Sequence, residues 1–247
     1  MDLLVDIGNS RIKWSTPDEL QHGRSRVGVC QDLPRILQKQ WRDMQRPDRV
    51  WISSVANLDV TEQLCVWLRQ IWKLSPVLVR SLPAQLGVIN GYKNPAQLGV
   101  DRWMAMLGAR AITTAASLVV DCGTATTIDS LDEQGHHLGG MILPGMQAMQ
   151  ETLLRDTAIQ TSGSSLEYSS FSRDTASAIA SAAVLATCCL IKQTAIQLQD
   201  RVKSEVCCIL TGGAAAELNG SLELEVHHEP HLVLNGLALV AAQSTYP

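Results

Sequence analysis

Two short segments of this 247-residue chain share one pattern, an apolar run that ends in Asp, any residue and Gly. The first is residues 3–10 (LLVDIGNS) and the second is residues 118–126 (LVVDCGTAT), which places Asp6 and Asp121 115 positions apart. An aspartate at the carboxyl end of a buried strand lies at the edge where open α/β sheets bind ligands. A glycine two positions later lets backbone N–H groups approach phosphate oxygens. The repeat therefore predicts two matched turns that together hold a polyphosphate and its metal ion.

A single Asp-x-Gly turn indicates little, because ordinary strand-to-turn junctions use Asp and Gly for steric reasons. The signal is the repeat at about the length of one domain. A third glycine turn, Gly212-Gly213, follows an apolar run at residues 206–210 and would let backbone pass against a nucleotide base or ribose. A plain strand-to-helix connection explains this pair of glycines about as well. The chain contains neither G-x-G-x-x-G nor G-x-x-x-x-G-K-[ST], which excludes the Rossmann and P-loop types of nucleotide site.

Between the two repeats lies an unrepeated segment, residues 99–103 (GVDRW), which leads into a helix that continues to about residue 111. Asp101 is suited to act as a general base toward a substrate hydroxyl, and Arg102 to grip a substrate carboxylate in a bidentate manner. Phosphoryl transfer needs little more than such positioning and charge stabilisation. The plainer interpretation is a helix amino terminus, with Asp101 facing the helix dipole and Arg102 solvated.

The elements that would carry these residues divide into two lobes, residues 1–115 and 116–247. All six tryptophans lie within the first 103 residues, whereas Ala, Gly, Ser and Thr dominate the second half. The first lobe is predicted to hold a hairpin of strands 3–7 and 11–15, strands 50–53 and 77–79, and an intervening helix whose capping box is Asp59 and Glu62. The second lobe is predicted to hold strands 118–121, 126–131 and 206–210 and helices 146–155, 174–198 and 232–242.

Composition restricts the class of protein. A net charge of −4, with no basic run longer than two residues, argues against a nucleic-acid partner. The uncharged stretches 175–191 and 231–247 are rich in Ala, Ser, Thr or Gln, so buried helices are expected there and not membrane spans. The first residues carry acids where a secretory signal has Lys or Arg, which predicts a soluble cytoplasmic protein. The seven cysteines include two adjacent pairs but no C-x-x-C, so buried thiols in a reducing compartment are expected, and Cys122 is predicted to pack under the sheet.

Taken together, the motifs of the chain resemble those of type III pantothenate kinases. The matching segments follow one another as Asp6 to Lys13, Gly99 to Arg102, Asp121 to Thr127, Gly139 to Gly145 and Asp174 to Ile179. The resemblance implies an α/β fold of two ribonuclease-H-like lobes, as in the acetate and sugar kinase/Hsp70/actin superfamily. It implies ATP-dependent phosphorylation of pantothenate to 4′-phosphopantothenate, the first step of coenzyme A biosynthesis. It also implies a homodimer that needs magnesium and a monovalent cation such as potassium or ammonium.

The resemblance also assigns roles to residues. ATP would be bound by the two turns and by the glycine pair, which comprise Asp6, Ile7, Gly8, Asn9, Ser10, Arg11, Ile12, Lys13, Gly123, Thr124, Gly212 and Gly213. Magnesium would lie at Asp6 and the monovalent cation at Asp121, both of which offer the oxygen ligands that hard cations prefer. Pantothenate would be held by Tyr92, Gly99, Val100, Asp101, Arg102 and Thr175, with Asp101 as the proton acceptor.

The chain departs from the family pattern with Ser10 in place of Thr, Asp174 in place of Asn and Ala182 in place of Gly. Asp174 adds a negative charge near an anionic substrate, so it either caps its helix and faces away or weakens pantothenate binding.

Two alternatives remain open. One is a non-catalytic, ATP-binding regulatory protein of the same fold, as the family's other description, Bvg accessory factor, suggests; such a protein has no need of Asp101. The other is a kinase of another small hydroxy acid or sugar, although a neutral sugar offers Arg102 no carboxylate. His227, His228 and His231 look like a metal cluster but are expected in a loop, because adjacent side chains on an extended segment point to opposite sides. His136 and His137 are expected in a hairpin turn.

Overall fold

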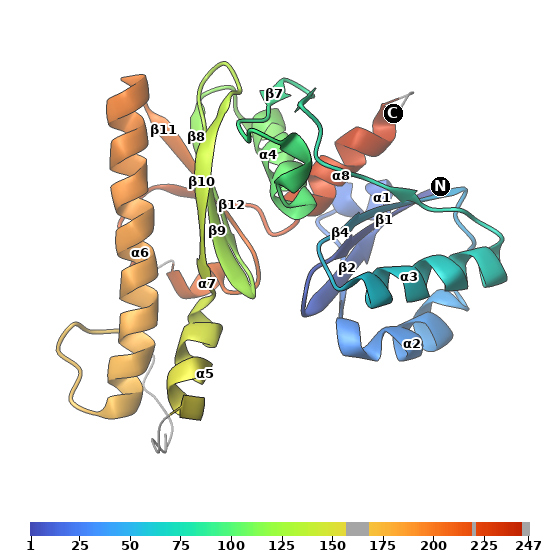
Figure 1. The fold of residues 1–247 in the computed structure, drawn as a ribbon, viewed down its shortest axis with the longest axis horizontal. Helices are drawn as coiled ribbons and strands as arrows, with labels where there is room; N and C mark the ends of the chain where they lie inside the picture. Colours follow the sequence, from blue (N-terminus) through green and yellow to red (C-terminus); the bar gives the residue numbers. More distant parts are fainter. Residues whose placement is uncertain (157–167, 219–220, 244–247) are drawn as a thin grey trace. The chain divides into compact units, whose positions relative to one another are not determined.

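The protein is described by a computed structural model that covers residues 1–156, 168–218 and 221–243. Its contacts divide the chain into two compact units (Figure 1). The first unit contains residues 1–112 and 231–247, and the second contains residues 113–230. Each unit is built on a five-stranded sheet.

The sheet of the first unit has the strand order β3-β2-β1-β4-β5. Strands β1 (Asp2–Ile7), β2 (Arg11–Ser15) and β3 (Arg26–Val29) form an antiparallel meander, while β4 (Arg49–Ser54) and β5 (Val77–Leu78) are added in parallel on the other side of β1. Because side chains alternate along a strand, Leu3, Val5 and Ile7 enter the core on one face while Leu4 and Asp6 lie on the other.

Helices α2 (Leu33–Ile36) and α3 (Leu58–Trp67) cover the first of these faces, and each continues into a π-helical turn, Leu37–Trp41 and Leu68–Trp72. The indole of Trp41 lies among three others, 5.8 Å from Trp14, 6.2 Å from Trp67 and 5.7 Å from Trp72 between ring centroids. These tryptophans therefore build a core. Cap geometry corrects one expectation: α3 is capped by Asn57, whose side chain accepts from the Asp59 N–H, because Asp59 already lies within the first helical turn.

Helices α4 (Val100–Ile112) and α8 (Leu232–Ala242) pack on each other and on β1 and β4, on the face that carries Asp6 (Figure 1). We expected residues 116–247 to form one lobe, but α8 belongs to the first unit. A Cβ atom on Gly108 would lie 2.6 Å from the Leu232 carbonyl oxygen, and one on Gly236 would overlap the Met104 carbonyl. Glycine on both helices thus lets their backbones approach closely. Through this packing, α8 becomes part of the same unit as strand β1.

The remaining elements of the first unit are short. They are α1 (Pro17–Gln21), the 3₁₀ turns Cys30–Asp32 and Pro95–Gln97, and a small hairpin of β6 (Ala84–Gln85) and β7 (Val88–Ile89).

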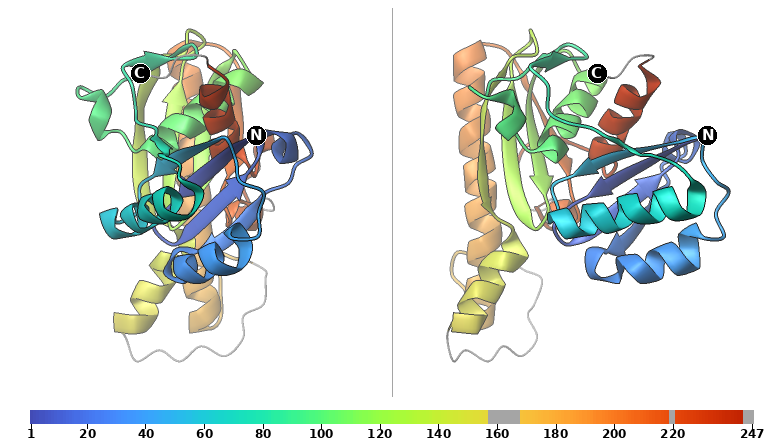
Figure 2. Two further views of the ribbon diagram at one scale, coloured as in Figure 1. Left: turned by 90° about the vertical axis from the view of Figure 1, so that its right-hand side faces the viewer. Right: turned by 45° about the vertical axis from the view of Figure 1, so that its right-hand side comes forward.

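The second unit repeats the sheet, with the strand order β10-β9-β8-β11-β12. Here β8 (Ala116–Cys122), β9 (Ala125–Leu131) and β10 (His137–Pro144) form the antiparallel meander, and β11 (Val206–Thr211) and β12 (Val226–His228) are added in parallel. The two sheets have one topology, which confirms the predicted duplication of a ribonuclease-H-like lobe. Helices α5 (Met146–Asp156), α6 (Thr175–Val202) and α7 (Ala215–Leu218) complete the unit (Figure 2).

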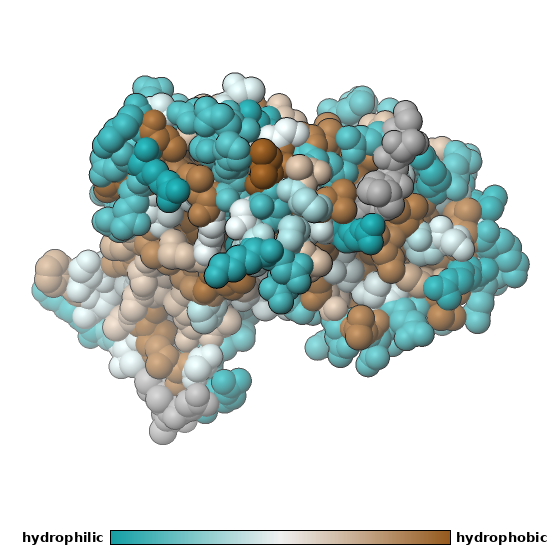
Figure 3. Space-filling model, turned by 45° about the horizontal axis from the view of Figure 1, so that its top comes forward, coloured by the Kyte–Doolittle hydropathy of each residue, from teal (hydrophilic) through white to brown (hydrophobic). Residues whose placement is uncertain are grey.

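The long helix α6 is apolar and lengthy enough, by those two criteria alone, to cross a membrane. Ala183, Val184, Cys188, Ile191 and Leu198 of this helix instead enter the core of the second unit together with Leu118 and Val120 of β8. The helix was predicted as a buried element, and the structure confirms this for one face only, because the other residues of the helix are exposed or half-buried. On the face of the protein shown in Figure 3, hydrophobic side chains are interspersed with hydrophilic ones, as on many protein surfaces.

His137 was expected in a turn but begins β10, where it is fully buried and its Nε2 lies 2.9 Å from Asp129 Oδ1. The register explains the difference, because the turn occupies residues 132–136, where the Asp132 N–H donates to the His136 carbonyl, and β10 then starts with His137 opposite Leu131.

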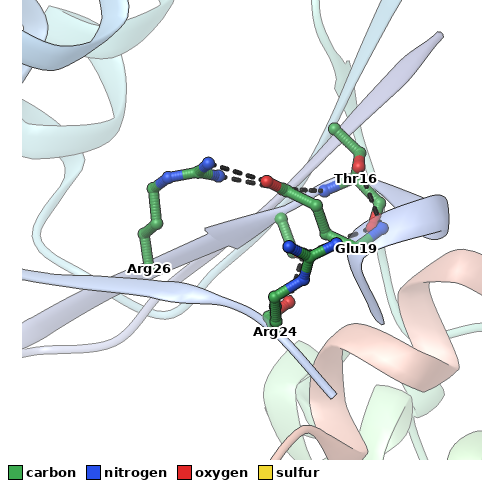
Figure 4. Close-up of polar contacts among 5 residues, drawn as sticks. Thr16, Glu19, Arg24 and Arg26 are labelled. Carbon is green, nitrogen blue, oxygen red and sulfur yellow. Dashed lines mark hydrogen bonds and ion pairs between the residues drawn. The ribbon is translucent and has the colours of Figure 1, made fainter. Parts of the chain in front are cut away.

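The start of α1 carries a capping box that ties the helix to β3 (Figure 4). Thr16 Oγ1 accepts from the Glu19 N–H and Glu19 Oε2 accepts from the Thr16 N–H, both at 3.2 Å. Arg26 donates two hydrogen bonds to the same carboxylate, at 2.7 and 2.8 Å. The hydrogen bonds from Arg26, aided by the one from the Thr16 N–H, hold the pKa of Glu19 below its usual value.

A Glu19→Gln substitution is expected to lower the free energy of unfolding by up to about 1 kcal/mol at pH 7, since Arg26 is about half exposed and water screens the pair. The pKa of Glu19 is lower in the folded state, so its contribution is complete above the unfolded pKa of about 4.3 and is lost as the pH falls through the folded pKa. Melting curves from pH 7 to pH 3 should show the gap between wild type and variant closing below about pH 4. The exposed Glu62→Gln is the control, and a gap that stays constant over this range would contradict the prediction.

Candidate active site

The first Asp-x-Gly turn joins β1 to β2. The Gly8 N–H donates to the Arg11 carbonyl at 2.9 Å, which closes the turn and leaves Asn9 and Ser10 exposed. Asp6 is opposite Lys13 in the antiparallel register and beside Ser53 in the parallel one. Side chains at paired positions project from the same face of a sheet, so Lys13, Asp6 and Ser53 form a row across it. Asp6 and Ser53 are buried, and Lys13 is half-buried.

The second turn joins β8 to β9 in the same way. The Gly123 N–H donates to the Ala125 carbonyl at 3.1 Å, and Gly123 and Thr124 are exposed. Asp121 is opposite Thr127 on β9 and beside Thr211 on β11, which gives a second row of three polar side chains. The structure thus places both aspartates at equivalent positions of the two sheets. The row of the first unit contains a lysine where that of the second contains a threonine.

Backbone surrounds the second turn closely. A Cβ atom on Gly212 would lie 2.5 Å from Asp121 Oδ1 and from the carbonyl carbon and oxygen of Cys122, and the φ angle of Gly212 is +93°. Only glycine fits both the space and the backbone conformation. Gly145, at the end of β10, approaches the same turn, and its Cβ would lie 2.7 Å from the Thr124 carbonyl oxygen. The backbone of Gly212 and Cys122 therefore forms a cradle beside the Asp121 carboxylate, and the next residue, Gly213, is exposed.

Cys122 lies beneath this turn and is fully buried. Burial, followed by the nearby charge of Asp121, raises the pKa of its thiol to about 12. The thiol is protonated at neutral pH and is no nucleophile. The prediction that Cys122 packs under the sheet is confirmed.

The unrepeated segment forms a cluster within the first unit. Arg102 Nη1 donates to the Tyr92 hydroxyl at 2.8 Å, and the guanidinium lies over the Tyr92 ring at 5.6 Å from its centroid. Asn90 holds the loop that carries Tyr92, because its side chain accepts from the Tyr92 N–H at 3.0 Å and donates to the carbonyls of Leu82 and Pro95. Arg102 is only 5% exposed, so the plainer interpretation of a solvated arginine is wrong.

Asp101 lies in the first turn of α4, next to Arg102, and is half-buried. Its Oδ1 accepts from the Arg102 N–H at 2.7 Å. A Cβ atom on Gly99 would lie 2.7 Å from the same oxygen, while the Gly99 carbonyl accepts from the Trp103 N–H to begin the helix. Gly99 is therefore required for Asp101 to adopt this position, and Val100 is buried between them.

Thr175 does not belong to this cluster as the structure describes it. It is the first residue of α6 in the second unit and is exposed. The preceding Asp174 caps the helix, since its carboxylate accepts from the Ser177 N–H at 2.9 Å, and this hydrogen bond lowers the pKa of Asp174. Of the two possibilities left open for Asp174, the capping role is confirmed.

Sequence reasoning missed the contact of Cys30 with the first turn, and it placed Gly145 in a matching segment without assigning it a contact with the second turn. The Cys30 N–H donates to the Ser10 carbonyl at 3.0 Å and its thiol donates to the Gly8 carbonyl at 3.3 Å. Burial raises the pKa of the Cys30 thiol, so it remains a donor at neutral pH. The sequence signals for Gly145 were the segment Gly139 to Gly145 and, within it, the Pro144-Gly145 dipeptide, which indicates a turn. Nothing local to Cys30 indicates its contacts.

Comparison with known proteins agrees with this geometry. Residues 2–197 match the family model described as type III pantothenate kinase. A type III pantothenate kinase from Nitrosospira multiformis is 40% identical, with 98% of this chain and 92% of the relative covered. One from Nitrosococcus oceani is 35% identical, with 99% and 95% covered. A crystal structure of a Baf family protein from Campylobacter jejuni has a TM-score of 0.62 at 20% identity and covers 96% of both chains, which shows the shared fold.

Proposed function

Because the chain belongs to the type III pantothenate kinase family, we propose that it transfers the γ-phosphoryl group of ATP to pantothenate and forms 4′-phosphopantothenate. The observation that carries this proposal is the buried Arg102, which is held by Tyr92 next to Asp101 at the start of α4. A guanidinium so placed is suited to a carboxylate such as that of pantothenate. The duplicated turns supply what a kinase needs in addition, backbone donors and carboxylates for a nucleotide.

In the proposed reaction, Asp101 accepts the proton of the pantothenate hydroxyl as that oxygen attacks phosphorus. Arg102 and Tyr92 fix the other end of pantothenate, so that binding energy is used to orient the hydroxyl. The Gly8-Asn9-Ser10 and Gly123-Thr124 turns bind the phosphates, and Gly212 and Gly213 lie against the nucleoside. Lys13 adds positive charge on the same sheet face as Asp6. Positioning and charge stabilisation by these groups account for most of the rate enhancement of phosphoryl transfer.

Two cations fit the residues present. Asp6 is a buried carboxylate at a strand end and would hold magnesium, which neutralises phosphate charge when bound together with ATP. Asp121 would hold a monovalent cation such as potassium or ammonium, because its carboxylate and the Cys122 carbonyl oxygen border one space, which a single Cβ on Gly212 would fill. Carboxylate and carbonyl oxygens are the ligands of hard cations.

The proposal also includes the setting of the enzyme. We infer a homodimeric cytoplasmic protein, with Thr175 contributing to pantothenate binding. The apolar helix α6 packs one face into the core of its unit, which supports a setting without membrane. The absence of any long basic run in the sequence supports a setting without nucleic acid.

The test is an assay of the purified protein with ATP, magnesium and pantothenate, and with either potassium or sodium as the only monovalent cation. Formation of phosphopantothenate that depends on potassium is expected. Normal binding of an ATP analogue without any product would overturn the kinase proposal and would support the regulatory alternative. If product forms equally well in sodium, the kinase activity is supported but the role of Asp121 in binding a monovalent cation is excluded.

A further inference from the structure

The residue that follows the third strand of the sheet contacts the phosphate turn in both units. In the first unit, β3 ends at Val29, and the next residue, Cys30, donates its N–H to the Ser10 carbonyl at 3.0 Å. In the second unit, β10 ends at Pro144, and the next residue, Gly145, donates its N–H to the Thr124 carbonyl, also at 3.0 Å. Ser10 and Thr124 are each the last residue before the second strand of their sheet. The two hydrogen bonds are therefore equivalent.

The side-chain direction at the two positions is equivalent as well. A Cβ atom on Gly145 would run into the Gly123 carbonyl, and the Cys30 thiol donates to the Gly8 carbonyl at 3.3 Å. Each direction thus leads to the carbonyl of the glycine in its own Asp-x-Gly motif. The turns differ in length by one residue, since the Gly8 N–H donates to the carbonyl of Arg11, three positions later, whereas the Gly123 N–H donates to that of Ala125, two positions later. The extra residue makes room for a side chain in the first unit, and a cysteine occupies that room.

The contact has a consequence for the peptide group that joins Gly8 to Asn9. The peptide is planar and trans, so its C=O and N–H point in opposite directions. Because the Gly8 carbonyl points at the Cys30 thiol, the Asn9 N–H points away from Cys30, on the other side of the turn. Asn9 is exposed, so a phosphate can approach it, and an N–H on the side of the turn away from Cys30 is suited to act as a donor.

We propose that Cys30 is a positioning residue for the first phosphate turn, which it holds by its N–H at Ser10 and by its thiol at Gly8. This inference rests on the proposed function, because it assumes that the turn binds ATP. Cys30 itself touches no substrate. It is 6% exposed, so it acts on the turn through these two contacts and not through contact with substrate.

The experiment compares Cys30→Ala, Cys30→Ser and the matched control Cys65→Ala in the full chain. Cys65 is a buried cysteine of the same unit, on α3, and is 4% exposed. The measurements are the Kd of a non-hydrolysable ATP analogue with magnesium, the KM of each substrate, kcat and Tm.

Cys30→Ala removes the thiol donor but keeps the backbone bond, so the analogue should bind about three- to tenfold more weakly, with a similar rise in the KM for ATP. The KM for pantothenate should stay within about twofold, and Cys30→Ser, which retains a donor, should recover most of the ATP affinity. Cys65→Ala should lower Tm comparably yet leave the ATP affinity unchanged.

Equal ATP affinities of Cys30→Ala and Cys65→Ala would overturn the positioning role, whatever their Tm values. If Cys30→Ser is folded but does not recover the ATP affinity, the thiol hydrogen bond to Gly8 has no part in positioning the turn. If the wild-type protein binds no ATP analogue at all, the proposed function fails instead, so the two failures are distinguishable.

Discussion

Replacement of Asp101 by Asn is expected to lower kcat by about 10²- to 10⁴-fold, the usual worth of a positioned general base. The amide has the shape of the carboxylate and keeps an oxygen for the Arg102 N–H, which now lies 2.7 Å from Asp101 Oδ1. It has no capacity to accept the proton of the substrate hydroxyl. The measurements are kcat and KM for pantothenate in steady state, together with the Kd of an ATP analogue, which should change by less than about threefold because both turns are intact.

Asp59→Asn is the matched control for this experiment. Asp59 also lies in the first turn of a helix of the first unit, and it is exposed. Its substitution removes the same charge from the same kind of position and should leave kcat unchanged. A loss of less than about tenfold in Asp101→Asn would remove Asp101 from the role of base, and loss of ATP affinity would assign it to binding.

A second large effect is expected from Gly212→Ala, which should weaken binding of the ATP analogue by more than about tenfold and destabilise the fold by about 1–3 kcal/mol. The added methyl group would lie 2.5 Å from Asp121 Oδ1 and from the Cys122 carbonyl, and the φ angle of +93° is unfavourable for any residue with a Cβ. Because these neighbours are backbone and the proposed cation ligand, relief requires the second turn to move. Isothermal titration with the analogue, at several potassium concentrations, and urea denaturation would measure the two effects.

Gly23→Ala separates backbone strain from the steric clash. Gly23 has a φ angle of +65°, but no heavy atom lies within 4 Å of its added Cβ. This variant should lose about 1–2 kcal/mol of stability from the left-handed conformation alone and should bind ATP normally. Equal ATP affinities in the two variants would contradict the role assigned to the cradle around Asp121.

Much of the fold followed from local pattern. The hairpin 3–7 and 11–15, strands β8, β9 and β11 and the helix 232–242 lie where alternation, helical spacing and turn residues predicted them. Strands β10 and β12 were not predicted, and β12 contains His227 and His228, which we expected in a loop. The repeat of Asp-x-Gly predicted a duplicated fold, and the two sheets have one topology. Sequence reasoning did less well at helix starts, where Asn57 and not the Asp59–Glu62 pair caps α3, because a cap depends on the conformation of one residue.

The candidate site likewise has residues that the sequence predicted and contacts that it did not. The identity of Asp6, Asp121, Asp101 and Arg102 was available from residue type and spacing. The burial of Arg102 against Tyr92 was not, because a charged residue near a helix start is exposed in most proteins, whereas Arg102 contacts a tyrosine on the loop that Asn90 holds.

What the sequence by itself determined is the pair of strand-turn-strand motifs, since a buried strand, its aspartate and its glycine are contiguous and their preferences are local. What only the tertiary structure decided is how those turns are supported. Cys30, Gly145 and Gly212 reach them from other strands, and α8 joins the first unit from the far end of the chain. These contacts depend on strand order and on the close approach of backbones. Both are properties of the assembled sheets and helices, so no short segment of the sequence predicts them.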